Sequence, residues 1–159
     1  MTKFTLRPIS NSSKYLTVTD LNLGRKYLQV TDLDPRPQFA DSVIFESNQT
    51  PNSNVLSPDT ATIKDVTSGV FIYIDTDFDS YGASFAKLTP EMNNASQFTI
   101  QMIDENTCYI LSNYVNGTNP FVNYNTSCAL SYWKNDPNTY FSKSPAFPDQ
   151  KLWYIDIVE

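Results

Sequence analysis

Three aspartates and two aromatic residues lie within one short stretch, D-T-D-F-D-S-Y-G at 75–82. A carboxylate accepts hydrogen bonds from two sugar hydroxyls at once, and an aromatic ring packs against the apolar face of a pyranose. Aspartate and glycine favour a turn, and turns on a rigid scaffold commonly carry binding residues. We therefore predict a carbohydrate-binding site made by Asp75, Asp77, Phe78, Asp79, Ser80 and Tyr81.

The same stretch allows three other interpretations. The simplest is a solvated hairpin turn that uses aspartate for its turn chemistry. Asp77 and Asp79 could supply oxygen ligands to Ca²⁺, but the glycine and the closing glutamate of an EF-hand loop are missing at the required spacing. Two acids on one turn could also form a glycosidase pair, but the sequence predicts no cleft between them. We therefore expect no metal site and no catalytic residue.

Enzyme chemistry is further restricted because the chain contains no histidine. This excludes a Ser-His-Asp triad, a Cys-His pair and an H-E-x-x-H zinc motif, so we expect a protein that is not an enzyme and needs no cofactor. Cys108 and Cys128 form no metal-binding motif, and the sequence leaves open whether they are thiols or a disulfide. The formal net charge of −6, without a basic run, disfavours nucleic acid and anionic membranes as partners.

Short strands are the elements expected to position the candidate residues. Gly, Pro, Asn and Asp interrupt the chain at short intervals and leave runs rich in Tyr, Phe, Val and Ile. Three segments align, each with a strand, a polar turn and a second strand that opens with Tyr15, Phe71 or Phe121. The third strands are expected at 26–30, 83–88 and 129–133, and the fourth strands at 43–45, 98–100 and 153–155.

Three units of four strands predict a β-trefoil, in which six strands close a barrel and six form a cap of hairpins. A single unit cannot bury its own apolar face, so we expect one domain over 1–159 with repeats at about 1–50, 51–104 and 105–159. A β-sandwich of irregular strands is the alternative fold. The stretch 75–82 then lies in the turn between the second and third strands of the middle repeat, and its equivalents are 20–26 and 123–127. Trp153 is expected in the core, and the position of Trp133 is left open.

Parts of the sequence resemble the agglutinin domain of amaranthin-type plant lectins. The matching stretches are S-N-S-S-K-Y-L at 10–16, L-Q-V at 28–30 with Asp-Pro at 34–35, and the end of the chain from 109 to 156. The resemblance covers nearly the whole chain. It implies a β-trefoil that binds galactose and N-acetylgalactosamine in T-antigen-like glycans, in plant defence. In the two-domain member of that family the sugar lies at a subunit interface, and a chain with one such domain needs a different partner surface.

We therefore expect a carbohydrate-binding lectin that acts as a homodimer, because bivalency lets a weak site agglutinate cells. One alternative is a β-trefoil protease inhibitor of the Kunitz or mushroom type, with a reactive loop at 49–59 or 135–148. The other is a protein-interaction module without a small ligand. No signal peptide or transmembrane run is visible, so the expected location is the cytoplasm and nucleus, or outside the cell if Met1 is not the natural start.

Overall fold

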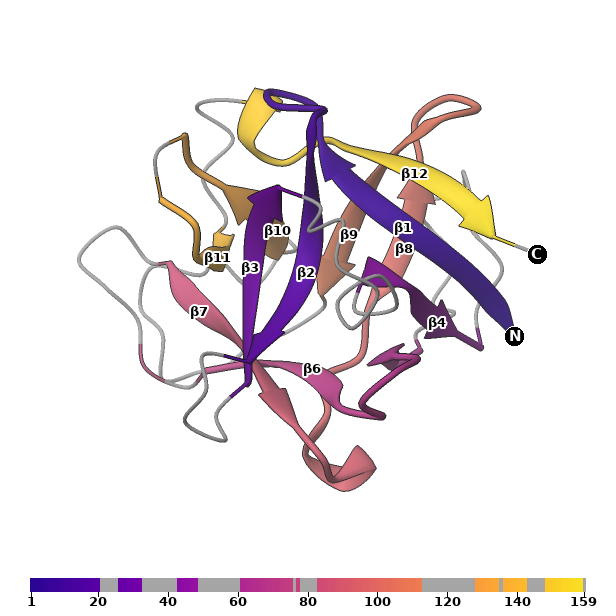
Figure 1. Cartoon of the computed structure of the whole chain (residues 1–159), viewed down its shortest axis with the longest axis vertical. Coiled ribbons are helices and arrows are strands. Elements are labelled where there is room, and N and C mark those ends of the chain that lie inside the picture. The colour runs from indigo at the N-terminus through magenta and orange to yellow at the C-terminus, as the bar shows by residue number, and fades with distance from the viewer. Residues whose placement is uncertain are drawn as a thin grey trace.

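The computed structural model describes residues 1–20, 26–32, 43–48, 61–75, 77, 83–112, 128–134, 136–142 and 148–158 (Figure 1). Over these residues the chain is all-β, as predicted, with two short 3-10 turns, η2 (Met92–Asn94) and η3 (Pro148–Gln150). The strands are β1 (Thr2–Pro8), β2 (Lys14–Asp20), β3 (Lys26–Asp32), β4 (Phe45–Ser47), β5 (Ile63–Asp65), β6 (Phe71–Ile74), β7 (Ser84–Thr89), β8 (Thr99–Met102), β9 (Thr107–Ser112), β10 (Cys128–Tyr132), β11 (Thr139–Ser142) and β12 (Trp153–Val158).

Six of the strands close a barrel. β1 lies between β12 and β4, β4 pairs with β5, and β9 lies between β8 and β12. The circle is completed by an isolated bridge between Ala61, just before β5, and Phe98, just before β8, with two backbone hydrogen bonds of 2.9 Å. Closure removes the free edges of these strands, which would otherwise attract other chains.

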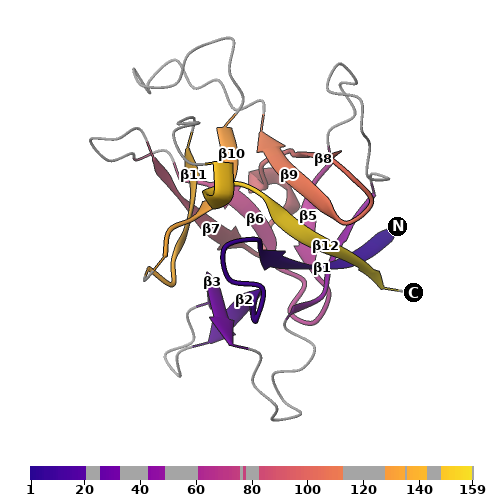
Figure 2. The same ribbon diagram turned by 90° about the horizontal axis from the view of Figure 1, so that it is seen from above.

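The other six strands form three antiparallel hairpins, β2–β3, β6–β7 and β10–β11. β7 pairs with β11, and β3 reaches the third hairpin through a bridge between Gln29 and Asn138. Seen from above, the hairpins lie on the side of the molecule away from the two termini (Figure 2). A six-strand barrel with three hairpins is consistent with the predicted β-trefoil.

Each repeat supplies large apolar side chains to one continuous core. Phe98 and Phe141 stack with ring centroids 5.2 Å apart, although they belong to different repeats. Trp153 is completely buried, as predicted, and its Nε1 donates a hydrogen bond of 3.0 Å to the Leu130 carbonyl. Burial of each such side chain stabilises the fold by roughly 1.5–3 kcal/mol, so the three repeats depend on one another.

The third repeat differs from the sequence prediction. The segment expected to be its third strand, 129–133, is the second strand, β10, and the third strand is β11, within a segment expected to be a loop. Residues 113–127 separate β9 from β10, against 9–13 and 66–70 at the same point in the other repeats. Because the connection between β9 and β10 is longer, the sequence alignment assigned β10 as the third strand of its repeat and not as the second. Phe121 and the predicted turn at 123–127 lie outside the described residues.

Cys108 is a free thiol buried in β9. Burial disfavours the charged thiolate and raises the pKa of Cys108 to about 12. The thiol is therefore protonated and unreactive at neutral pH.

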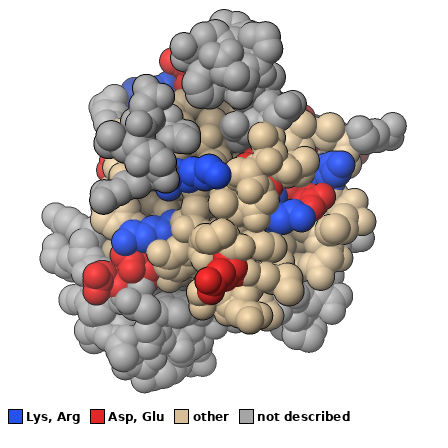
Figure 3. Space-filling view, turned by 60° about the horizontal axis from the view of Figure 1, so that its bottom comes forward, with Lys and Arg blue, Asp and Glu red and all other residues tan. Residues whose placement is uncertain are grey.

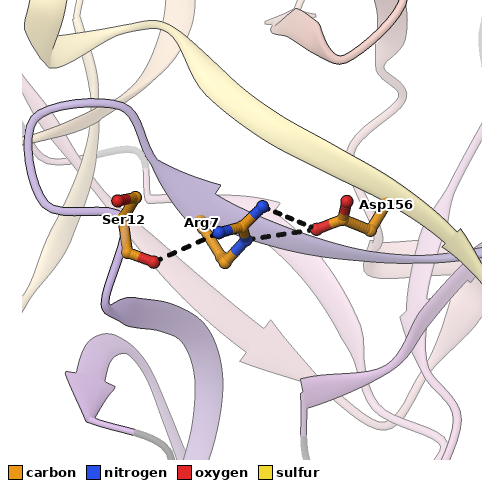
Figure 4. Close-up of polar contacts among 3 residues, drawn as sticks. All are labelled: Arg7, Ser12 and Asp156. Carbon is orange, nitrogen blue, oxygen red and sulfur yellow. Dashed lines mark hydrogen bonds and ion pairs between the residues drawn. The ribbon is translucent and has the colours of Figure 1, made fainter.

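A surface cluster of side chains links β1, the first strand of the barrel, to β12, its last strand. Arg7 on β1 forms an ion pair with Asp156 on β12, with Nη2 3.1 Å from Oδ2, and donates to the Ser12 carbonyl at 3.3 Å (Figure 4). The guanidinium also lies over the Tyr154 ring, 5.2 Å from its centroid. These contacts hold β1 against β12 and pair the charges of Arg7 and Asp156.

No helix among the described residues is long and apolar enough to cross a membrane.

Candidate functional site

The three hairpins share one pattern of cross-strand pairs, which defines equivalent positions. The inner pairs are Leu16 with Val30, Ile72 with Leu88, and Leu130 with Phe141, and the next pairs are Val18 with Leu28, Ile74 with Ala86, and Tyr132 with Thr139. Tyr27, Phe85 and Asn138 occupy equivalent positions in this register. Each lies one residue before the third-strand member of the second pair, which is Leu28, Ala86 or Thr139.

A cavity of about 550 Å³ opens where the hairpins meet. Such a volume suits a small ligand such as a sugar. Its lining includes all three equivalent residues, Tyr27, Phe85 and Asn138. Each repeat contributes this position, so the cavity reaches the centre of the three hairpins, but apart from Asn138 its lining belongs to the first and second repeats. The other lining residues are Lys26, Leu28, Tyr73, Asp75, Asp77, Ala86, Lys87 and Leu88.

One wall of the cavity carries an ion pair between Asp75 and Lys87. The Lys87 Nζ lies 2.9 Å from the Asp75 Oδ2, and the lysine side chain is 48% exposed. The hydrogen bond to Asp75 raises the pKa of Lys87; burial opposes it, and the charges of Asp75 and Asp77 support it. The backbone N–H of Asp75 donates to the Phe85 carbonyl at 3.0 Å, which holds the carboxylate at the end of the hairpin. The wall therefore presents a donor and an acceptor side by side.

Aromatic rings form the neighbouring part of the cavity. Phe85 is 44% exposed and Tyr27 is 37% exposed, although both are large apolar groups. Phe85 packs on Tyr140 with centroids 4.7 Å apart, and Tyr140 packs on Trp133 at 4.4 Å. We call Phe85, Tyr140 and Trp133 the aromatic stack. It supports Phe85 from the side of the third hairpin and leaves part of this ring to the cavity.

The polar atoms of the aromatic stack are bound within the protein. The Tyr140 hydroxyl donates to Asp136 Oδ2 at 2.7 Å, and Trp133 Nε1 donates to Gln150 Oε1 at 2.6 Å. Asp136 Oδ1 also accepts a bond of 3.0 Å from the backbone N–H of Asn138. These bonds fix the turn between β10 and β11 and, with it, the ring that supports Phe85.

The third wall is neutral. Gln29 Nε2 donates to Asn138 Oδ1 at 3.0 Å, and the Thr19 hydroxyl donates to Gln29 Oε1 at 2.9 Å. This chain of bonds fixes the orientation of the Asn138 amide at the cavity. The first and third hairpins thus share one hydrogen-bond network behind the lining residues.

The structure describes two of the six residues that the sequence predicts to bind carbohydrate. Asp75 and Asp77 line the cavity, whereas Phe78, Asp79, Ser80 and Tyr81 lie outside the described residues. Sequence reasoning missed Tyr27, Phe85, Lys87 and Asn138. The aromatic residues had a signal, because Tyr27 and Phe85 alternate with apolar residues and must face away from the core. Asn138 had none, because the third hairpin was expected elsewhere.

Metal chemistry finds no support in the described parts of the chain, which hold no group of three or more His, Cys, Asp or Glu residues suited to an ion. Asp75 is already paired with a lysine, which competes with a cation for the carboxylate. The arrangement is suited to hydrogen bonding and ring packing.

No family model matches the sequence, and no curated protein matches it. Solved structures are similar in fold. The agglutinin of Rhizoctonia solani aligns with a TM-score of 0.64 and 13% identity, over 98% of this chain and 94% of that chain. A salivary protein from Culex quinquefasciatus aligns with a TM-score of 0.65 and 14% identity, over 99% and 94%.

A third similar structure is the Macrolepiota procera ricin B-like lectin in complex with lactose. It aligns with a TM-score of 0.61 and 12% identity, over 97% of this chain and 94% of that chain. At these identities the likeness establishes a shared fold.

Proposed function

We propose that this protein is a non-enzymatic lectin that binds a terminal galactose or N-acetylgalactosamine residue in the cavity between the hairpins. The observation that carries the proposal is the exposed Phe85 ring beside the Asp75–Lys87 pair, within a cavity of about 550 Å³. A partly exposed aromatic ring next to paired donor and acceptor groups matches the mixed apolar and polar surface of a pyranose.

The proposal gives each group a role. Lys87 donates to one sugar hydroxyl and Asp75 accepts from its neighbour, so the pair recognises two adjacent hydroxyls. Phe85 packs against the C–H face of the ring, which in galactose is continuous because the axial hydroxyl lies on the other face. Asn138, held by Gln29, supplies a further polar contact.

A ligand without net charge fits the paired charges of the site. On the face drawn in Figure 3, acidic and basic side chains stand in small adjacent groups on a mostly uncharged surface. The opposite charges of Asp75 and Lys87 also cancel within the cavity. A ligand without net charge is therefore not repelled by either wall.

The similar proteins support the lectin class. Two of them are an agglutinin and a lectin bound to lactose, a galactose-terminated disaccharide. The salivary protein shares the fold as well, so the fold by itself does not determine the function. The amaranthin resemblance points to the same sugars and stays a prediction. A β-trefoil protease inhibitor is less favoured, because β11 occupies the middle of one segment considered as the reactive loop.

The test is a glycan array followed by competition with free galactose, N-acetylgalactosamine and glucose. We expect binding to glycans with terminal galactose or N-acetylgalactosamine, competed by these two sugars and not by glucose. Phe85→Ala should weaken binding about tenfold, whereas Ile157→Ala, which removes another exposed apolar side chain on β12, should keep it. An array without signal for any glycan would refute the proposal, and binding that Phe85→Ala leaves intact would refute the site.

A further inference from the structure

We infer that the protein has one glycan site per chain, on the pseudo-threefold axis and shared by all three repeats, so that each chain is monovalent. This inference rests on the proposed lectin function and concerns the number and composition of its sites. The alternative for a chain of three repeats is one separate site in each repeat.

The position of the cavity carries the argument. Tyr27, Phe85 and Asn138 are equivalent in the register of the three hairpins, and all three line the same cavity. Equivalent residues of three repeats meet only close to the axis that relates the repeats. A feature on that axis occurs once, whereas a feature away from it occurs three times.

Contacts between the hairpins place them around this point. Tyr140 on β11 pairs with Phe85 on β7, and their rings pack together. Asn138 bridges to Gln29 on β3, with a side-chain hydrogen bond in addition. The cavity is therefore formed by association of the three hairpins and does not exist in any one of them.

The repeats also differ in chemistry at a second set of equivalent positions. Two residues after Tyr27, Phe85 and Asn138 on each third strand lies one member of a diagonal cross-strand pair. The three pairs are Thr19 with Gln29, Asp75 with Lys87, and Trp133 with Tyr140. The first pair is hydrogen-bonded and neutral, the second is an ion pair and the third is a ring contact. Only the middle hairpin combines a charged pair with an exposed lining ring, so the other two hairpins do not present the same constellation.

The Asp75–Lys87 pair, the Phe85 ring and the Asn138 amide line one cavity together and are unlike in chemistry, which fixes a single orientation of the ligand. One glycan terminus contacts the ion pair, the aromatic ring and the Asn138 amide at the same time. A monovalent chain binds a cell-surface glycan without cross-linking it. Agglutination then requires self-association of the chain, because a second site must come from a second copy.

The experiment counts ligands. Native mass spectrometry of the purified chain with increasing lactose should show one specifically bound lactose at saturation. Tyr27→Ala, Phe85→Ala and Asn138→Ala should each weaken that one binding event about tenfold without changing its number, and Ile157→Ala should do neither. Circular dichroism and urea unfolding check that each variant is folded.

Three separate sites predict a different result. The wild type would bind three lactose molecules, and each substitution would leave two with unchanged affinity. That outcome overturns the inference and leaves the lectin proposal standing. The wild-type count does not depend on the variants, so a variant that fails to fold does not remove the test. If Asn138→Ala binds as tightly as the wild type, the third repeat has no part in the site.

Valence gives a second readout. At a concentration at which sedimentation shows a monomer, the chain should bind erythrocytes and not agglutinate them, and a tandem fusion of two copies should agglutinate. Agglutination by the monomer would overturn the inference. Absence of binding to every glycan on the array would instead overturn the lectin proposal, and the inference with it.

Discussion

The second and third hairpins carry different side chains at equivalent positions. On β6–β7 the diagonal pair is Asp75 and Lys87, and the lysine is half exposed beside the cavity. On β10–β11 it is Trp133 and Tyr140, whose rings pack on each other and whose polar atoms are bound within the protein. The same backbone geometry therefore exposes polar groups at the cavity in one hairpin and fixes the structure in the other.

The two pairs are also expected to stabilise the fold by different amounts. A solvent-exposed ion pair stabilises a protein by about 0–1 kcal/mol, so Asp75 and Lys87 add little to the fold. A packed pair of aromatic rings contributes about 0.5–1.5 kcal/mol beyond the burial of its area, so the aromatic stack adds more. Four predictions test whether binding and stability separate between the two hairpins.

The largest effect is expected for Tyr140→Ala. The substitution removes the ring contacts with Phe85 and Trp133 and the hydrogen bond to Asp136. The free energy of unfolding, measured with urea, should fall by about 2–3 kcal/mol. Tyr109→Ala on β9, another partly buried tyrosine, is the control and should cost less. Equal losses would mean that the stack has no special part in stability.

Asp75→Asn should lower the affinity for lactose more than the stability of the fold. The substitution keeps the shape of the side chain and removes the charge that orders Lys87, so the lactose affinity in calorimetry should fall about tenfold, or about 1.4 kcal/mol. The free energy of unfolding should change by less than about 1 kcal/mol. Glu46→Gln removes the acid of the Lys64 ion pair on the barrel and should leave affinity unchanged. A large stability loss without loss of affinity in Asp75→Asn would reverse our assignment of the hairpins.

Tyr140→Phe separates the hydroxyl of the stack from its ring. The 2.7 Å hydrogen bond from the hydroxyl to Asp136 is lost, and both ring contacts remain. We expect a decrease of about 1 kcal/mol in the free energy of unfolding, from the same urea experiment. A decrease as large as that of Tyr140→Ala would show that the hydroxyl, and not ring packing, holds the turn.

The smallest effect concerns pH. The hydrogen bond to Asp75 raises the pKa of Lys87 above its ordinary value of 10.5. The stability that this pair contributes is therefore complete below pH 10.5 and is lost as the pH rises through the higher pKa of the folded state. NMR titration of the lysine side chain should show this raised pKa in the wild type and a lower one in Asp75→Asn. An identical titration in both would contradict the pairing.

The sequence predicted the first two repeats well because their signals are local. Leu16 and Val18 alternate with more polar residues, Ile72 and Ile74 alternate with Phe71 and Tyr73, and all four aliphatic residues are buried as the two-residue period predicts. In the third repeat a strand was predicted at 129–133, but as the third strand; it is the second, so the hairpin was assigned one strand too early. Strand order depends on the length of the preceding connection, which periodicity does not report.

The sequence by itself determined the class of the fold, because strand periodicity and turn residues act over a few positions of the chain. It also identified Asp75 and Asp77 as candidates from their chemistry. Only the tertiary structure decided that Tyr27, Phe85 and Asn138 meet at one cavity. These residues lie in three different repeats, and their meeting depends on barrel closure and hairpin register. Both arise from pairing between distant strands, which no local pattern specifies.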